Sequence, residues 1–382
     1  MRLLIVSHSC ATPENRELYA VLRERTGWDI TLVVPRLWKD EFQNALNAKS
    51  WPSMDDATVF FDVLGSGNII LHAYRTRWRK FLAAGKFDAI FVCHEPYAVS
   101  TFQIWAANRL GRRVPFGFLS CQNIRKDYPF PFRQMESSVC RTSAFAFPIT
   151  PDVQAVMEGK GFRGKSALCP FPVDTQKYSP DAILRLSPEF RDASDGQITI
   201  GYVGRVVEAK GFRTLAAALS QIKDLPWRFV VIGAGEFEAE FDRLALAGGV
   251  AERIYKRGYI PHAETPAHMA AMDVLVLPSE TQANWKEQFG RVLLESMACG
   301  TPVVGSDSGE IPKLINASGG GLVFAERDPE ALASALRRMI EDAPLRAVCA
   351  ERGRQWVIAN VGLQSVADAI AKTIVNAVGG AS

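Results

Sequence analysis

The chain has 382 residues, of which 48% are hydrophobic and 22% are charged. This length exceeds what one hydrophobic core usually supports, so we expect two domains. The formal net charge is only +3, which argues against a nucleic-acid partner.

The seven cysteines are odd in number, scattered and without a CxxC pair. This usage is typical of reduced thiols in a cytoplasm rather than of disulfides or a cysteine metal site. Met1–Ser7 is too short for the core of a signal peptide, and no apolar run reaches the length of a membrane span. We therefore expect a cytoplasmic protein.

The first half opens with the order strand, loop, helix, strand. The strands are predicted at Leu3–Val6 and Ile30–Val34, the loop at Ser7–Asn15 and the helix at Glu17–Arg25. This order indicates an α/β domain with a parallel sheet, whose ligands bind at the carboxyl ends of the strands. His8 lies in that loop, either as a ligand-facing residue or as a loop histidine without a role.

Tyr74–Lys80 mixes four cations with two aromatic residues. The cations are Arg75, Arg77, Arg79 and Lys80, and Trp78 stands among them. Such a stretch can contact anionic lipid head groups, which would make the protein peripheral on the inner face of a membrane. The alternative is a solvated helix face.

Phe87–Cys93 is predicted to be a buried strand, with His94-Glu95-Pro96 just past its carboxyl end. In a parallel sheet His94 would point into the ligand crevice, where an imidazole can donate or accept a proton. A hydrogen-bonded structural histidine is the alternative. Asn123–Arg133, rich in proline and aromatic residues, suits a binding loop or a merely structural one.

Strand Ala144–Ile149 precedes Thr150 and Pro151, which form a favourable helix start. Prolines then punctuate the chain from Pro170 to Pro180. We place the domain boundary near residues 175–195, where Ser187–Gly196 is polar and irregular.

The second half repeats the α/β pattern. Strands are predicted at Ile198–Val203 and Trp227–Ile232, with helix Thr214–Ile222 between them. Arg205 and Lys210 lie in the first glycine-bounded loop and could hold a diphosphate from two sides, or simply be solvated. Gly233-x-Gly235 lacks the third glycine of the dinucleotide fingerprint, so no NAD site is predicted.

Further elements follow in the same order. They are strand and turn Arg253–Ile260, a helix from Pro261 through Met272, strand Asp273–Leu277, strand Gly319–Phe324, helix Pro329–Glu341 and one or two helices from Leu345 onward.

Two acids eight positions apart, Glu287 and Glu295, flank the start of a predicted helix, Arg291–Ala298. Glu287 would lie in the loop before the helix and Glu295 one to two turns inside it, roughly 10 Å away. The free amides of the helix N-terminus between them would suit a phosphate. An acid, an anion site and a second acid match the hydroxyl–diphosphate–hydroxyl layout of a sugar nucleotide. The alternative is that both acids lie on a solvent-exposed helix face.

Taken together, these loops resemble those of the retaining GT-B glycosyltransferases of family 4, also called glycosyl transferases group 1. The similarity lies in Gly204-Arg205, Lys210-Gly211, Gly233-x-Gly235, Pro278-Ser279, the Glu287–Glu295 pair and Gly300–Val304, in family order across roughly residues 198–330. The first half matches more loosely, through its opening strand, His94-Glu95-Pro96 and the segment Pro172–Pro180.

This resemblance implies two Rossmann-like α/β domains facing across a cleft, with the terminal helix crossing back to the first. It implies an acceptor-side domain at residues 1–180, a nucleotide-sugar domain at 181–360 and the crossing helix at 361–382. It also implies a hexosyltransferase that uses a nucleotide-diphosphate sugar, UDP in preference to GDP, and a glycan or lipid-linked acceptor.

The resemblance further implies roles for individual residues. Arg205 and Lys210 would hold the diphosphate, and Glu287 and the Phe289-Gly290 backbone would bind sugar hydroxyls. Glu295 would accept from the ribose, and the segment ending at Ile260 would meet the base. His94 would face the transferred sugar. The implied catalytic residues are thus His94, Glu287, Arg205 and Lys210, and the donor-binding set adds Phe289, Gly290, Arg291, Val292, Glu295 and Ile260.

The implied chemistry is a front-face displacement in which the departing phosphate takes the acceptor proton. No Asp-x-Asp motif occurs in the sequence, so we expect neither a metal nor another cofactor. Two departures stand out: Ser7–Asn15 lacks the family's usual glycine pair, and Arg291 replaces an aliphatic residue. Arg291 would then add a phosphate or sugar contact, or face solvent.

Two alternatives remain open. The same fold could serve a nucleotide-sugar epimerase or a glycan phosphorylase, or a protein that binds sugar nucleotides without catalysis.

Overall fold

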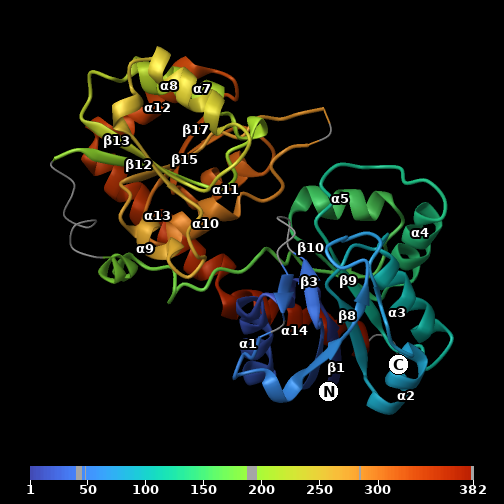
Figure 1. Cartoon of the computed structure of the whole chain (residues 1–382). Helices are drawn as coiled ribbons and strands as arrows, with labels where there is room; N and C mark the ends of the chain where they lie inside the picture. Colours follow the sequence, from blue (N-terminus) through green and yellow to red (C-terminus); the bar gives the residue numbers. More distant parts are fainter. Residues whose placement is uncertain (40–44, 48, 187–195, 284, 380–382) are drawn as a thin grey trace. The chain divides into compact units, whose positions relative to one another are not determined.

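The computed structural model describes residues 1–39, 45–47, 49–186, 196–283 and 285–379. The chain divides into two compact units (Figure 1): unit 1 is Met1–Pro172 with Leu363–Ser382, and unit 2 is Val173–Gly362. The expected boundaries lay after residues 180 and 360. Of the irregular segment predicted at Ser187–Gly196, only Gly196 is among the described residues.

Unit 1 is built on a seven-stranded parallel sheet with the order β11-β10-β9-β8-β1-β2-β5. Its strands are β1 (Arg2–Val6), β2 (Asp29–Pro35), β5 (Thr58–Phe61), β8 (Ala89–Val92), β9 (Phe116–Ser120), β10 (Phe145–Pro148) and β11 (Lys165–Ser166). Two short hairpins accompany the sheet: β3 (Leu37–Lys39) with β4 (Ala45–Asn47), and β6 (Val63–Leu64) with β7 (Ala73–Tyr74). The parallel sheet predicted from the first two strands is confirmed.

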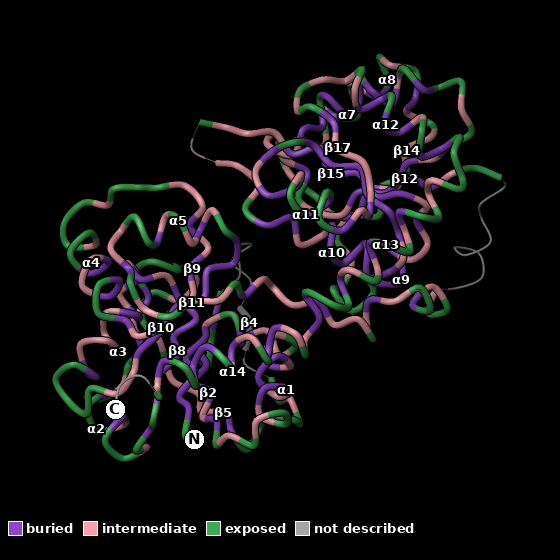
Figure 2. Tube along the Cα trace, turned by 180° about the vertical axis from the view of Figure 1, so that it is seen from behind, coloured by how far each residue is buried: buried purple, intermediate pink, exposed green. Residues whose placement is uncertain are grey.

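Helices cover both faces of this sheet. They are α1 (Glu17–Thr26), α2 (Trp78–Gly85), α3 (Val99–Arg109), α4 (Phe132–Thr142), α5 (Pro151–Gly159) and α14 (Leu363–Gly379). Along β1 the side chains alternate: Leu3 and Ile5 pack in one core with α1 and α14, whereas Leu4 and Val6 pack in another with α2, α3, α4 and α5. Figure 2 shows the strands as the buried layer.

Unit 2 repeats this plan on a six-stranded parallel sheet with the order β14-β13-β12-β15-β16-β17. Its strands are β12 (Ile198–Val203), β13 (Trp227–Ile232), β14 (Ile254–Gly258), β15 (Val274–Leu277), β16 (Val303–Ser306) and β17 (Gly321–Phe324). Its helices are α7 (Phe212–Gln221), α8 (Glu238–Ala247), α9 (Thr265–Ala270), α10 (Arg291–Ala298), α11 (Ile311–Ser318), α12 (Pro329–Glu341) and α13 (Ala343–Val361). Across both units, short 3₁₀ helices lie at Ser9–Ala11, Pro13–Arg16, Asp55–Ala57, Pro180–Arg185, Glu208–Lys210 and Ala251–Arg253.

Strands β12 and β13 and helices α10 and α12 begin and end where the sequence predicted. Helix α9 runs only from Thr265, with Pro266 in its first turn, to Ala270, whereas the sequence predicted a helix through Met272. No helix in the described part of the chain is long and apolar enough to cross a membrane. All seven cysteines, each within the described residues, are free.

Candidate active site

Three neighbouring strands of unit 2 send their loops to the same edge of the sheet. β12 leads into Gly204–Gly211, β13 into Gly233–Gly235 and β15 into Pro278–Gly290. The loops bond to one another through their backbones: Val206 N–H donates to Ala234 O at 3.0 Å and Glu280 N–H to Ala209 O at 2.8 Å. This carboxyl edge is where parallel sheets bind ligands.

Gly211 lets two of these loops meet. Its φ is +71°, and a Cβ at this position would lie 1.8 Å from the carbonyl oxygen of Pro278. Only glycine fits both the left-handed backbone and the close approach. Gly211 is also the N-cap of helix α7, which begins at Phe212.

Lys210 and Glu287, predicted on separate grounds, form an ion pair. Lys210 Nζ lies 2.5 Å from Glu287 Oε2, and their side chains are only 15% and 12% exposed. Ser279 Oγ donates to the same carboxylate oxygen at 2.8 Å, and the ring of Trp285 lies 4.9 Å from Lys210 Nζ. An ammonium has three N–H donors, so Lys210 can hold Glu287 and still offer a donor to an anion.

Helix α10 carries the second acid. Gly290, with φ +67°, is the N-cap of α10, and as a glycine it offers the helix no side-chain cap. Glu295 is buried and accepts a hydrogen bond from Arg291 Nε at 2.8 Å, one turn earlier on the same helix. The Arg291 side chain is 41% exposed, so it pairs with Glu295 and also faces solvent. Burial, and then the Glu295 carboxylate, raises the pKa of the Tyr178 hydroxyl.

The other predicted donor residues lie around this edge. Arg205 is exposed, and its carbonyl accepts a hydrogen bond from the buried Tyr202 hydroxyl at 2.7 Å. Phe289 is buried, while Val292 and Ile260 are partly buried. Unit 2 therefore brings Lys210, Glu287 and Ser279 into direct contact, with Arg291 and Glu295 a short helix turn beyond.

In unit 1, His94 lies just past β8 as predicted, but its ring is only 2% exposed. Its Nε2 accepts from the His8 backbone N–H at 3.0 Å, so Nδ1 carries the proton and donates to Ser100 Oγ at 3.0 Å. Burial lowers the pKa of His94 well below its usual value and that of His8 to about 3, so both rings are neutral. Its predicted role toward the sugar stays a prediction.

One other sequence candidate is placed differently from expectation. In the basic stretch, Tyr74 and Trp78 are 2% and 4% exposed and belong to the core, so the aromatic part of the lipid-contact prediction is wrong. The four cations are exposed. The loop before α4, predicted as a binding loop or a structural one, is contacted by Lys160, whose side chain is 8% exposed. Its Nζ donates to Gln122 Oε1 and Lys126 O at 3.0 Å and to Glu136 at 2.7 Å.

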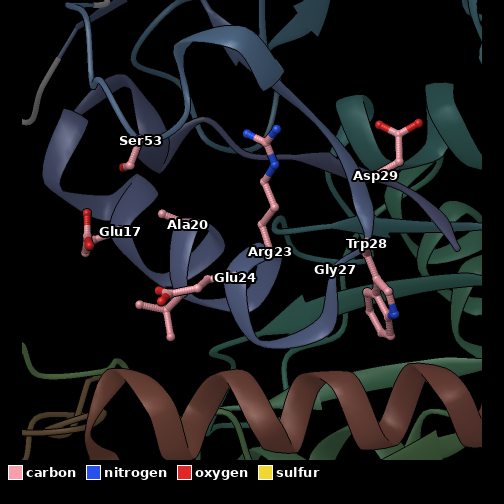
Figure 3. A pocket seen from close by; sticks show the side chains of 9 residues that line it. Glu17, Ala20, Arg23, Glu24, Gly27, Trp28, Asp29 and Ser53 are labelled. Atoms are coloured by element: carbon pink, nitrogen blue, oxygen red, sulfur yellow. The ribbon is translucent and has the colours of Figure 1, made fainter.

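A hollow with a cavity volume of about 600 Å³ lies elsewhere in unit 1 (Figure 3). Its lining comes from α1 and the start of β2, with Ser53 added. This is the amino end of β2, not its carboxyl end, and Arg23 in the lining is paired with Asp56. None of the predicted site residues lines this hollow.

Residues within unit 2 are similar in sequence to a known family. The family described as Glycosyl transferases group 1 matches residues 187–356. The chain is 29% identical over 197 residues to a 2-deoxystreptamine glucosyltransferase of Streptomyces kanamyceticus, covering 51% of this chain and 49% of the relative. It is 31% identical over 191 residues to a GDP-mannose-dependent alpha-(1-6)-phosphatidylinositol monomannoside mannosyltransferase of Mycobacterium tuberculosis, covering 49% and 50%. The chain thus spans about half the length of the curated relatives it matches.

The whole chain is similar in structure to Anabaena Alr3699/HepE, solved in complex with UDP. The TM-score is 0.73 at 17% identity, with 98% of this chain and 100% of the other covered. A likeness at this identity shows the fold, so the predicted GT-B class is confirmed.

Proposed function

We propose that the protein is a glycosyltransferase, because residues 187–356 match the family described as Glycosyl transferases group 1. It moves a hexosyl unit from a nucleotide-diphosphate sugar to a glycan or lipid-linked acceptor and retains the anomeric configuration. The observation that carries the proposal is the contact of Lys210, Ser279 and Glu287 beside the uncapped N-terminus of α10. It joins a cation, an acid and the N-terminus of a helix at one edge of the sheet.

Each group has a role in this proposal. Lys210 and Arg205 hold the diphosphate and offset the negative charge that develops on the leaving phosphate. The first amides of α10 hold a phosphate oxygen. Glu287 and the Phe289-Gly290 backbone bind sugar hydroxyls, Glu295 binds the ribose, and Ile260 and Val292 line the rest of the donor site. His94 acts toward the transferred sugar.

The bond between C1 of the sugar and the phosphate oxygen breaks, and the acceptor oxygen bonds to C1 on the same face. The acceptor's proton passes to the departing phosphate, and the nucleoside diphosphate leaves. Protein cations and amides supply the electrostatic stabilisation, so the donor needs no metal or other cofactor in this proposal.

Support for the donor and acceptor class comes from the similar proteins. Anabaena HepE was solved with UDP, which favours a UDP-sugar, whereas the mycobacterial relative uses GDP-mannose. That relative acts on a phosphatidylinositol mannoside, and another similar protein from Rhizobium meliloti is named for lipopolysaccharide core biosynthesis. We therefore propose UDP in preference to GDP, and a glycan or lipid-linked acceptor.

The test is nucleotide release from a panel of UDP- and GDP-sugars, with glycan and glycolipid extracts as acceptors. Glu287→Ala should lower kcat/KM by at least 100-fold, whereas Glu252→Ala, at an exposed residue of the Ala251–Arg253 turn, should leave it unchanged. No turnover with any donor contradicts the proposal. Dependence on inorganic phosphate indicates a phosphorylase, donor conversion without acceptor an epimerase, and nucleotide binding without turnover a non-catalytic binder.

We also propose a cytoplasmic protein that contacts the inner face of a membrane through unit 1. Arg75, Arg77, Arg79 and Lys80 are exposed and make no ion pair within the described residues. Tyr74 and Trp78 are buried and cannot contact lipid. The turn before Tyr74, however, carries Ile69, Ile70 and Leu71, which are 51%, 36% and 53% exposed. Exposed aliphatic side chains next to unpaired cations suit an anionic lipid surface.

Co-sedimentation with vesicles of phosphatidylglycerol and phosphatidylcholine tests this contact. Glutamine at the four cations should release the protein from the vesicles. The control variant carries glutamine at four exposed cations elsewhere, which are Lys223, Arg338, Arg352 and Lys372, and has the same net charge. If both variants bind the vesicles equally, the four cations do not form a specific lipid-binding surface.

A further inference from the structure

A tryptophan that the proposed function does not use lies beside the unit 2 site. Lys210 Nζ lies over the ring of Trp285, 4.9 Å from the ring centroid. The same nitrogen is 2.5 Å from Glu287 Oε2. Trp285 and Glu287 are two residues apart, and both side chains reach this one ammonium. The site therefore combines a cation, a carboxylate and an aromatic ring.

The segment that carries Trp285 is a hairpin fixed to unit 2 at its base. Figure 1 shows it in orange, between β15 and α10, standing out from the edge of the sheet. Gln282 N–H donates to Trp285 O at 2.7 Å and closes the hairpin. At its base, the Glu280 carboxylate accepts from Thr214 Oγ1 at 2.7 Å and from Arg327 Nε at 3.3 Å. These bonds to α7 and to the loop after β17 fix the direction in which the hairpin presents its side chains.

Trp285 differs from a core tryptophan of the same unit. Trp227 in β13 is 1% exposed, and its indole N–H donates to Ile222 O at 2.8 Å. Trp285 belongs to a loop and is partly exposed. Its ring therefore adds a flat apolar surface to the site, which a ligand held by Lys210 and Glu287 can reach.

We propose that Trp285 packs against the C–H face of the hexose that the donor carries, and so helps to select the sugar. The inference rests on the proposed function, since it takes Glu287 to bind hydroxyls of that hexose. A pyranose presents hydroxyls at its rim and C–H bonds on its faces. A carboxylate accepts from the rim, and an aromatic ring covers a face.

This contact sets a requirement for the sugar. The face that lies on Trp285 has to carry C–H bonds only. An axial hydroxyl on that face would lose its hydrogen bonds to water and find no acceptor on the indole ring, which is costly. The donor class that fits is thus a neutral hexopyranose with one apolar face.

The ring could instead act only through Lys210. A cation over a tryptophan face is stabilised by about 0.5–2 kcal/mol, and this attraction orients the ammonium that holds the diphosphate. Such an effect would be the same for a free nucleotide and for a nucleotide sugar, because both carry the diphosphate. A contact with the hexose affects the nucleotide sugar alone.

Isothermal titration calorimetry of the full chain separates the two. The ligands are UDP and GDP, and UDP-glucose, UDP-galactose and GDP-mannose. Trp285→Ala should weaken the tightest nucleotide sugar about tenfold or more, and its free nucleotide less than threefold. Trp285→Phe keeps a ring and should retain most of the affinity. Trp356→Ala, which removes another partly exposed tryptophan of unit 2, in α13 (Ala343–Val361), should change neither.

The inference is overturned if Trp285→Ala weakens free nucleotide and nucleotide sugar by the same factor, or changes neither. Both results leave the proposed glycosyl transfer standing, because turnover by the unaltered protein is measured separately. If the unaltered protein binds none of the five ligands, the proposed function fails and this inference fails with it. The Tm of each variant reports whether it folds, and Trp285→Leu, apolar but without a ring, replaces Trp285→Ala if that variant does not.

Discussion

At the scale of single residues, the site depends on partners that sequence spacing does not reveal. Lys210 and Glu287 were predicted to bind different parts of the donor, yet they contact each other at 2.5 Å. Ser279 completes this contact from the end of β15. Its position in Pro278-Ser279 was recognised as a motif, but its role toward Glu287 follows only from the geometry.

Ser279→Ala removes a hydroxyl that donates to the Glu287 carboxylate. Hydrogen bonds to charged groups contribute about 1.5–3 kcal/mol, so kcat/KM of the proposed reaction should fall by roughly tenfold or more, since about 1.4 kcal/mol is tenfold. Steady-state kinetics measures this. Ser220→Ala removes a hydroxyl that donates to Ala217 O and is the control. Equal rates in the two variants would show that Ser279 does not contribute to the reaction.

At the scale of elements, helices and strands with a strong local signal lie where predicted. α12 begins at Pro329 with Asp328 as its N-cap, and α5 begins at Pro151 with Thr150 as its cap. In both helices the capping residue directly precedes the proline that starts the helix, so a short stretch of sequence predicts the start. The β3–β4 and β6–β7 hairpins were not predicted, because strands of two or three residues carry too little hydrophobic periodicity.

Gly211→Ala tests whether the loops after β12 and β15 must touch. The methyl would meet Pro278 O, and φ is positive, so we expect a loss of about 1–3 kcal/mol in the free energy of unfolding and weaker nucleotide binding. Gly249→Ala is a matched control: its φ is +69°, but no atom lies within 4 Å of the added methyl. Denaturant unfolding and a nucleotide titration measure both. If the two variants behave alike, backbone strain rather than the loop contact is responsible.

Helix α14 supplies part of the unit 1 core although it lies at the other end of the chain. Ile370 is 0% exposed and packs in the same core as Leu22 of α1. Ile370→Ala should therefore cost about 2–5 kcal/mol of stability. Val375 on the same helix is 52% exposed, and Val375→Ala should change stability by about 0.5 kcal/mol or less. Equal Tm values for the two variants would show that α14 does not hold unit 1 together.

At the scale of the whole molecule, the chain is two parallel-sheet units that differ in what they present at their carboxyl edges. Unit 2 gathers a lysine, two acids and an uncapped helix, while unit 1 gathers buried neutral histidines. The proposed binding site for the nucleotide sugar therefore lies in unit 2 alone.

Hydrogen exchange with and without UDP tests this division. Bound nucleotide should slow exchange in the loops after β12 and β15 and in the first turn of α10. The opening strand β1 and helix α14 should exchange at the same rate in both samples. GDP serves as the matched ligand that tests the preference for UDP. Protection confined to unit 1 would contradict the placement of the donor.

The sequence by itself determined the α/β class, the two domains and most elements of unit 2, because hydrophobic periodicity, proline, glycine and caps act over a few neighbouring residues. It also identified Arg205, Lys210, Glu287 and Glu295 as candidates. Only the tertiary structure decided that Lys210 pairs with Glu287 and Glu295 with Arg291, that Trp78 is buried, and that His94 packs against His8 and His72. These contacts depend on which loops the parallel sheets bring to one edge, and sheet order is a long-range property that no local pattern encodes.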